Sequence, residues 1–101
     1  MTKHVIETVT FKLENGTSKE DFLETVPCST DFVKEQPGFI ARRLSCAEDG
    51  TWIEHVEWES MADAKRAAAI FGQTESVKPF LECIDGPSAK LVHSELETSL
   101  G

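Results

Sequence analysis

The sequence predicts an α+β fold with the element order β-α-β-β-α-β. Two observations predict it: four segments alternate between apolar and polar residues, and two capped helical segments separate them. The chain has 101 residues, of which 40% are apolar and 28% charged, a composition typical of a folded globular protein with one core. We therefore expect residues 1–101 to form a single domain.

The first part of the chain predicts one strand and one helical region. His4–Leu13 alternates and is rich in Val and Thr, which favours a strand. Ser18 with Asp21 three residues later resembles a capping box, which predicts a helix start. Pro27 interrupts the apolar stripe that follows, so we expect a kinked helix or two short helices, ending before Pro37.

The middle of the chain predicts a β-hairpin. Gly38–Ala47 and Thr51–Glu59 both have strand composition, and Asp49-Gly50 between them is typical of a tight turn.

The last part of the chain predicts two helices and a strand. Ser60 caps an alanine-rich helix over Met61–Phe71, and Gly72 ends it. A short helix with Ser76 as its cap follows, and Ser88–Glu97 alternates as the fourth strand. Short connections and right-handed crossovers make this a ferredoxin-like sandwich: a four-stranded antiparallel sheet of order 4-1-3-2 with both helical regions on one face.

Alternation divides the sheet into two faces, and we place the face with the larger apolar groups under the helices. That face is Val5, Glu7, Val9, Phe11, Leu13, Ile40, Arg42, Leu44, Cys46, Trp52, Glu54, Val56, Trp58, Ala89, Leu91 and His93. The opposite face still carries Ile6, Phe39, Ala41, Ile53, Val92 and Leu96. Monomers rarely expose so much apolar surface, so we expect a homodimer in which two such open faces pair.

Four ionisable residues stand out on the face assigned to the helices: Glu7, Arg42, Glu54 and His93. The predicted strand order makes Glu7 and His93 neighbours, and a carboxylate beside an imidazole makes a general base. Arg42 pairs with Glu54 or holds an anionic or oxygen-rich ligand. The alternative is that these groups are satisfied polar bridges, or reach solvent at strand ends.

Several classes of function are excluded or disfavoured. The formal net charge of −8 argues against nucleic-acid binding, and no segment is long and apolar enough to span a membrane. The three cysteines show no metal-ligand spacing, and the three histidines are divided between different strands, so we expect no metal site. An odd number of cysteines fits reduced thiols in a cytoplasmic protein.

The combination of motifs resembles the dimeric α+β barrel superfamily, and within it small proteins grouped with the antibiotic biosynthesis monooxygenases. The motifs that carry the resemblance are Glu7–Leu13, Gln36–Ile40 with Arg42 and Leu44, Gly50–Trp52, Glu57–Ser60 before an alanine-rich helix, Phe80, Ile84-Asp85 and Leu91–His93. The resemblance spans nearly the whole chain. It implies a homodimer with one small cavity per protomer between sheet and helices.

The resemblance also implies an activity. Members of the family oxidise aromatic compounds without metal or flavin, and relatives degrade haem. The haem-degrading pattern is not matched, because the only asparagine, Asn15, lies in a predicted turn. By residue type, His93 would be the base and Glu7 would orient it. The substrate-binding residues would be Trp52, Trp58, Arg42, Glu54 and Phe11.

Three functions therefore remain open at this stage. The first is a cofactor-independent oxygenase or related isomerase acting on a small aromatic or enolic substrate. The second is a non-catalytic protein that binds a small aromatic ligand in the same cavity. The third is a dimerisation module whose own side chains fill the cavity.

Overall fold

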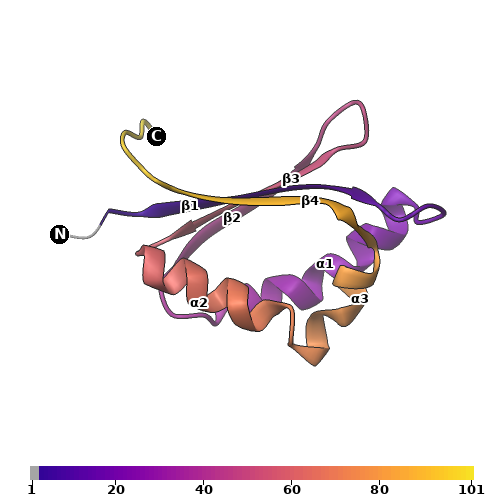
Figure 1. The fold of residues 1–101 in the computed structure, drawn as a ribbon, viewed down its shortest axis with the longest axis horizontal. Helices are drawn as coiled ribbons and strands as arrows, with labels where there is room; N and C mark the ends of the chain where they lie inside the picture. The colour runs from indigo at the N-terminus through magenta and orange to yellow at the C-terminus, as the bar shows by residue number, and fades with distance from the viewer. Residues whose placement is uncertain (1–2) are drawn as a thin grey trace.

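The computed structural model describes residues 3–101 and has helices on one face of a single sheet (Figure 1). The elements in chain order are β1 (Val5–Leu13), α1 (Lys19–Lys34), β2 (Phe39–Cys46), β3 (Trp52–Trp58), α2 (Met61–Phe71), η1, a single 3₁₀ turn (Glu75–Val77), α3 (Lys78–Glu82) and β4 (Ile84–Glu95). All strand pairs are antiparallel, in the order β2-β3-β1-β4. The predicted ferredoxin-like fold and strand order are confirmed.

The two predicted helix starts are present at the predicted serines. Ser18 Oγ accepts a hydrogen bond from the Asp21 amide at 3.0 Å, and Ser60 Oγ accepts one from the Asp63 amide at 3.1 Å. Each cap satisfies one of the first-turn amides that have no partner inside the helix. The predicted cap of the short helix was wrong, because Val77 precedes α3 and supplies no side-chain hydrogen bond.

Of the two forms expected around Pro27, the pair of separate short helices is wrong. α1 runs as one helix from Lys19 to Lys34, with Pro27 inside it. Side chains beside the proline bond to helix carbonyls: Thr25 Oγ1 donates to the Phe22 carbonyl at 2.6 Å, and Ser29 Oγ donates to the Val26 carbonyl at 2.8 Å. Pro27 lacks the amide that would donate to the Leu23 carbonyl, and these two bonds flank that gap without filling it.

A β-bulge at the start of β2 exchanges two predicted faces. The pairing with β3 shifts between Phe39 and Ala41, so Phe39 lies opposite Trp58. The Phe39 ring packs edge-on against Trp58, with ring centroids 5.9 Å apart, and so lies on the helix side. Ile40 is exposed instead. Strict alternation assigns both residues wrongly because the bulge inserts one extra residue.

β4 begins at Ile84, four residues earlier than predicted, and ends at Glu95. Gly86 and Pro87, which precede the predicted strand, lie within β4 at a local irregularity, where the pairing with β1 shifts between Thr10 and Lys12. Ser88 Oγ accepts from the Lys12 amide at 2.9 Å and donates to the Asp85 carbonyl at 2.6 Å. Because β4 is an edge strand, it tolerates a proline that cannot donate to the ladder.

The space between sheet and helices holds two apolar clusters. One contains Val5, Val56, Trp58, Ala64 and Ala67. The other contains Phe11, Phe22, Trp52 and Phe80. Small alanines on α2 let that helix approach the sheet closely over the first cluster. Among residues 3–101, no helix is long and apolar enough to cross a membrane.

Candidate functional site

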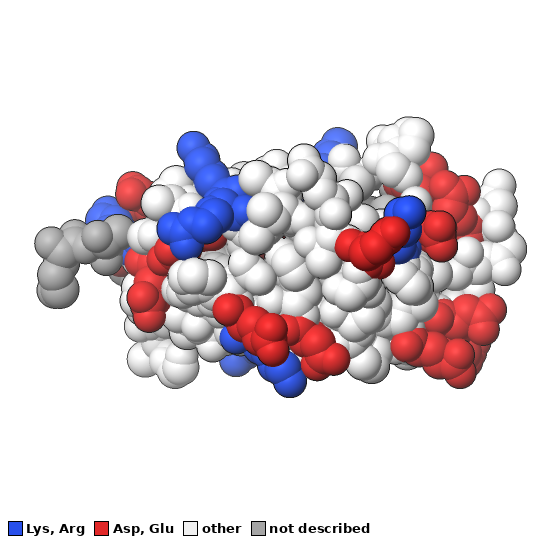
Figure 2. Space-filling model, turned by 90° about the horizontal axis from the view of Figure 1, so that it is seen from below, with Lys and Arg blue, Asp and Glu red and all other residues white. Residues whose placement is uncertain are grey.

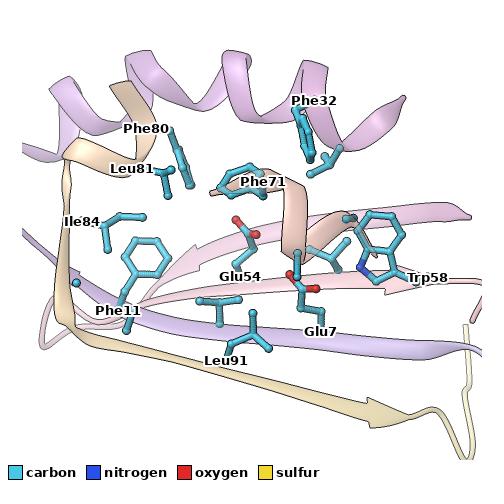
Figure 3. A pocket seen from close by; sticks show the side chains of 17 residues that line it. Glu7, Phe11, Phe32, Glu54, Trp58, Phe71, Phe80, Leu81, Ile84 and Leu91 are labelled. Carbon is cyan, nitrogen blue, oxygen red and sulfur yellow. The ribbon is translucent and has the colours of Figure 1, made fainter. Parts of the chain in front are cut away.

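A cavity of about 280 Å³ lies between the sheet and the helices, and residues of both apolar clusters line it (Figure 3). Its aromatic walls are Phe11, Phe32, Trp58, Phe71 and Phe80. The other lining residues are Glu7, Val9, Val33, Glu54, Val56, Ala67, Ala68, Leu81, Ile84, Gly86, Ala89 and Leu91. Side chains of the chain itself therefore leave this space open, contrary to the third hypothesis.

The exposed part of the lining lies along the edge of the sheet. Gly86, Ala89 and Leu91 of β4 line the cavity and are at least partly exposed, Leu91 with 50% of its surface. Residues of the central strands at the cavity, such as Phe11 and Val56, are buried. A ligand would therefore enter past β4.

Glu7 is a buried carboxylate on the cavity floor, and His93 holds it from the neighbouring strand. The two residues are direct partners in the β1–β4 register, and His93 Nε2 lies 2.9 Å from Glu7 Oε1. Glu7 lines the cavity, whereas His93 lies outside the lining and is 13% exposed at its side chain. The histidine thus supports the carboxylate from behind, and the carboxylate faces the space where a ligand would sit.

The surroundings of Glu7 raise its pKa above the ordinary value of 4.5. Burial is the largest cause, because it disfavours the charged form. The hydrogen bond and charge of His93 oppose this shift, and the Glu54 carboxylate adds to it. A buried carboxylate with a raised pKa is a stronger base than an exposed one, which suits proton abstraction from a weakly acidic group.

Glu54 is the second carboxylate of the cavity, and Arg42 neutralises it. Arg42 Nη2 donates to Glu54 Oε2 at 2.6 Å, and the two side chains are only 8% and 11% exposed. Arg42 Nη1 also donates to Thr30 Oγ1 at 3.1 Å, which ties β2 to α1. The guanidinium lies 5.6 Å from the centre of the Phe80 ring and outside the cavity lining. Of the two predicted roles for Arg42, the pairing with Glu54 is present.

Trp58 carries the one other polar group of the lining side chains. Its indole nitrogen is buried and has no hydrogen-bond partner within residues 3–101. Figure 3 shows this nitrogen on the side of the ring toward Glu7. Since an unpartnered buried donor is unfavourable, an acceptor atom of a ligand beside Glu7 would be favoured there.

The structure brings four of the seven predicted site residues into the cavity: Glu7, Phe11, Glu54 and Trp58. His93 and Arg42 contact the two carboxylates from outside the lining. Trp52 lies away from the cavity, where its ring packs against Phe22 with centroids 4.8 Å apart and Lys19 Nζ lies 5.9 Å from its centre.

Sequence reasoning missed the walls that the helices supply. Phe32, Phe71, Phe80 and Leu81 come from α1, α2 and α3. Phe80 and Leu81 lie in the predicted short helix, but their spacing indicates only a buried face and not what that face borders. The available signal for these walls was Phe71, a large aromatic residue at the end of the alanine-rich helix.

The described residues offer no metal site, since no group of three or more His, Cys, Asp or Glu side chains is suitably placed within residues 3–101. The cysteines Cys28, Cys46 and Cys83 are unpaired in this range and half-buried. Burial raises the pKa of the Cys83 thiol, which disfavours a reactive thiolate.

Comparison with known proteins gives matches to solved structures. No protein-family model and no curated protein matches the sequence. A mutant form of SnoaB, a cofactor-independent oxygenase from Streptomyces nogalater, superposes with a TM-score of 0.78 at 16% identity, covering 98% of both chains. A Bordetella bronchiseptica protein assigned by name to the antibiotic biosynthesis monooxygenases gives 0.77 at 17% identity, over 96% of this chain and 100% of that one.

A third match contains a bound ligand. The ActVA-Orf6 monooxygenase of Streptomyces coelicolor, solved with nanaomycin D, gives a TM-score of 0.69 at 17% identity over 97% of this chain and 91% of that one. The chain has the fold of the antibiotic biosynthesis monooxygenases. At these identities the likeness shows the fold of the chain, and its chemistry has to be argued from the cavity.

Proposed function

We propose that this chain is a cofactor-independent oxygenase that takes a small aromatic or enolic substrate into the cavity. The observation that carries the proposal is a buried, basic carboxylate, Glu7, that faces an aromatic-walled space. The fold it shares with SnoaB and ActVA-Orf6 supports the same class of chemistry. The volume suits a small substrate, because it is about twice the ~150 Å³ that holds benzene.

In this proposal Glu7 is the proton acceptor and His93 is a positioning residue, the reverse of the roles first predicted. The cavity lining supports this assignment, since Glu7 reaches the cavity and His93 does not. The substrate hydroxyl or enol gives its proton to Glu7. The resulting anion transfers one electron to O₂, and the radical pair joins through a new C–O bond to form a peroxide anion. This anion takes the proton back to give a hydroperoxide, which loses water as its O–O bond and the C–H bond at the same carbon break, leaving a carbonyl.

Oxygen uptake tests this proposal. A bicyclic hydroxyarene under air should give uptake that Glu7→Gln lowers at least about tenfold, because amide cannot accept the proton. Glu57→Gln is the matched control: Glu57 also contacts a histidine, with His4 Nδ1 2.7 Å from Glu57 Oε2, but it is absent from the cavity lining. Uptake that is equal in both variants would overturn the assignment of Glu7.

The same cavity supports a second candidate function, a non-catalytic protein that binds a small aromatic ligand. The observation that favours it is the lining, in which only Glu7 and Glu54 are ionisable. Binding of a hydroxyarene without any oxygen uptake under air would favour this candidate.

We also propose that two copies pair through the open face of the sheet. Figure 1 shows that the helices leave this face uncovered, and Val92 on it is 58% exposed. Ile6 and Ile53 lie on the same face and are only half-buried. Pairing two copies would remove this apolar surface from water.

A further inference from the structure

Each carboxylate of the cavity has one oxygen that accepts no hydrogen bond from residues 3–101. His93 contacts Glu7 through Oε1, and Arg42 contacts Glu54 through Oε2. Within residues 3–101, no hydrogen bond reaches Glu7 Oε2 or Glu54 Oε1. Figure 3 shows both carboxylates pointing from the sheet into the same space. The cavity therefore offers two separate acceptors to one ligand.

The basic partners of these acceptors contact them from outside the cavity. Arg42 on β2, Glu54 on β3, Glu7 on β1 and His93 on β4 lie on four different strands of the sheet. Arg42 and His93 lie outside the lining, and the helices contribute no ionisable side chain to it. The ligand-facing side is therefore electronegative.

The helix side of the cavity is also suited to an organic cation. Phe71 and Phe80 belong to the lining, and Figure 3 shows the Phe71 ring next to the Glu54 carboxylate. The faces of aromatic rings attract ammonium groups. The chain's overall charge of −8 adds an attraction for cations at longer range, and Figure 2 shows acidic side chains at several places on the helix-covered side of the molecule.

We propose that the cavity selects an aromatic ligand that carries both a hydroxyl group and a basic amine. The hydroxyl binds at Glu7, which rests on the function proposed above, and the ammonium group binds Glu54 Oε1 among the aromatic rings. Glu54 is thus a specificity-determining residue. A ligand with a carboxylate in place of the amine is rejected, because it brings a further negative charge beside the two glutamates.

Three matched probes test this selectivity by calorimetry without oxygen: an aminomethyl naphthol, the parent naphthol, and the hydroxynaphthoate with the same substitution pattern. We expect the amine to bind about tenfold or more tightly than the naphthol, and the naphthoate to bind more weakly than either. Glu54→Gln should abolish the advantage of the amine over the naphthol, while Glu57→Gln should leave that advantage intact.

The ranking on the unmodified protein is informative even if Glu54→Gln fails to fold. Any of three results would overturn the proposal: naphthol binds as tightly as the amine, the naphthoate binds tightly, or no probe binds. Oxygen uptake separates the two proposals. If the protein prefers the amine but shows no oxygen uptake, the oxygenase proposal is contradicted and the amine-selectivity proposal is supported. If naphthol gives oxygen uptake but the amine binds no more tightly, the oxygenase proposal is supported and the amine-selectivity proposal is contradicted.

Discussion

Glu7 and His93 face each other directly across β1 and β4, and 2.9 Å separates Glu7 Oε1 from His93 Nε2. The pair spans the boundary of the cavity, because the carboxylate belongs to its lining and the imidazole does not. The two residues are 86 positions apart in sequence, so only the pairing of β1 with β4 brings them together.

Removing His93 should shift the pH dependence of activity. The hydrogen bond and charge of His93 lower the pKa of Glu7, so His93→Leu should raise that pKa further. If Glu7 must be ionised to act, the acid limb of kcat/KM moves to higher pH in this variant. His93→Gln, which keeps a hydrogen-bond donor, should restore part of the difference. An unchanged acid limb in His93→Leu would show that the histidine does not act through Glu7.

Replacing Glu7 should change how stability depends on pH. Because the folded-state pKa is raised above 4.5, the folded protein binds more protons than the unfolded chain between the two values. The free energy of unfolding contributed by Glu7 is therefore present at low pH and falls as pH rises through this window. Urea denaturation at a series of pH values should show that Glu7→Gln loses this fall. A fall of the same size in the variant would contradict the raised pKa.

Breaking the Arg42–Glu54 pair should destabilise the fold. Both side chains are almost fully buried, so Arg42→Met leaves an unpaired carboxylate and should cost about 3–5 kcal/mol of unfolding free energy. Adding Glu54→Leu removes that carboxylate and should recover most of the loss. Denaturant melts of both single variants and the double variant measure this coupling. A double variant as unstable as Arg42→Met would show that the pair contributes through packing alone.

A side chain at Gly38 should destabilise the fold more than a side chain at Gly50. Both have positive φ, +83° and +89°, but a Cβ on Gly38 would collide with the Asp63 carboxylate, while Gly50 borders open space. Gly50→Ala should cost about 1 kcal/mol from backbone strain, and Gly38→Ala clearly more. Thermal melts of the two variants compare them directly. Equal melting temperatures would contradict the close approach of Gly38 to α2.

A charge on the open sheet face should prevent pairing of two copies. Val92→Glu places a carboxylate where the proposed interface would bury it, so light scattering should give a dimer for the unmodified chain and a monomer for the variant. A monomer for the unmodified chain at micromolar concentration would contradict the paired-sheet proposal.

Sequence reasoning predicted the fold well because its signals are local. Alternation marked the strands, and the serine caps marked where α1 and α2 begin. It failed where pairing overrides local pattern: the bulge at Phe39 exchanged two faces, and the edge position of β4 let Pro87 lie within a strand. Neither effect is visible without the partner strand.

The same limit applies to the candidate site. Alternation placed Glu7 and Glu54 on the helix side, where the structure has them. It could not separate Trp58, which lines the cavity, from Trp52, which lies outside it, because both have the same parity on one strand. The difference arises from Phe22 of α1 packing on Trp52, a tertiary contact.

A crystal structure of the protein with a bound naphthol, grown without oxygen, tests the central claim most directly. We expect the naphthol oxygen within about 2.5–3.0 Å of Glu7 Oε2, with the rings between Trp58 and Phe71. A naphthol bound with its oxygen away from Glu7, or outside the cavity, would contradict the account.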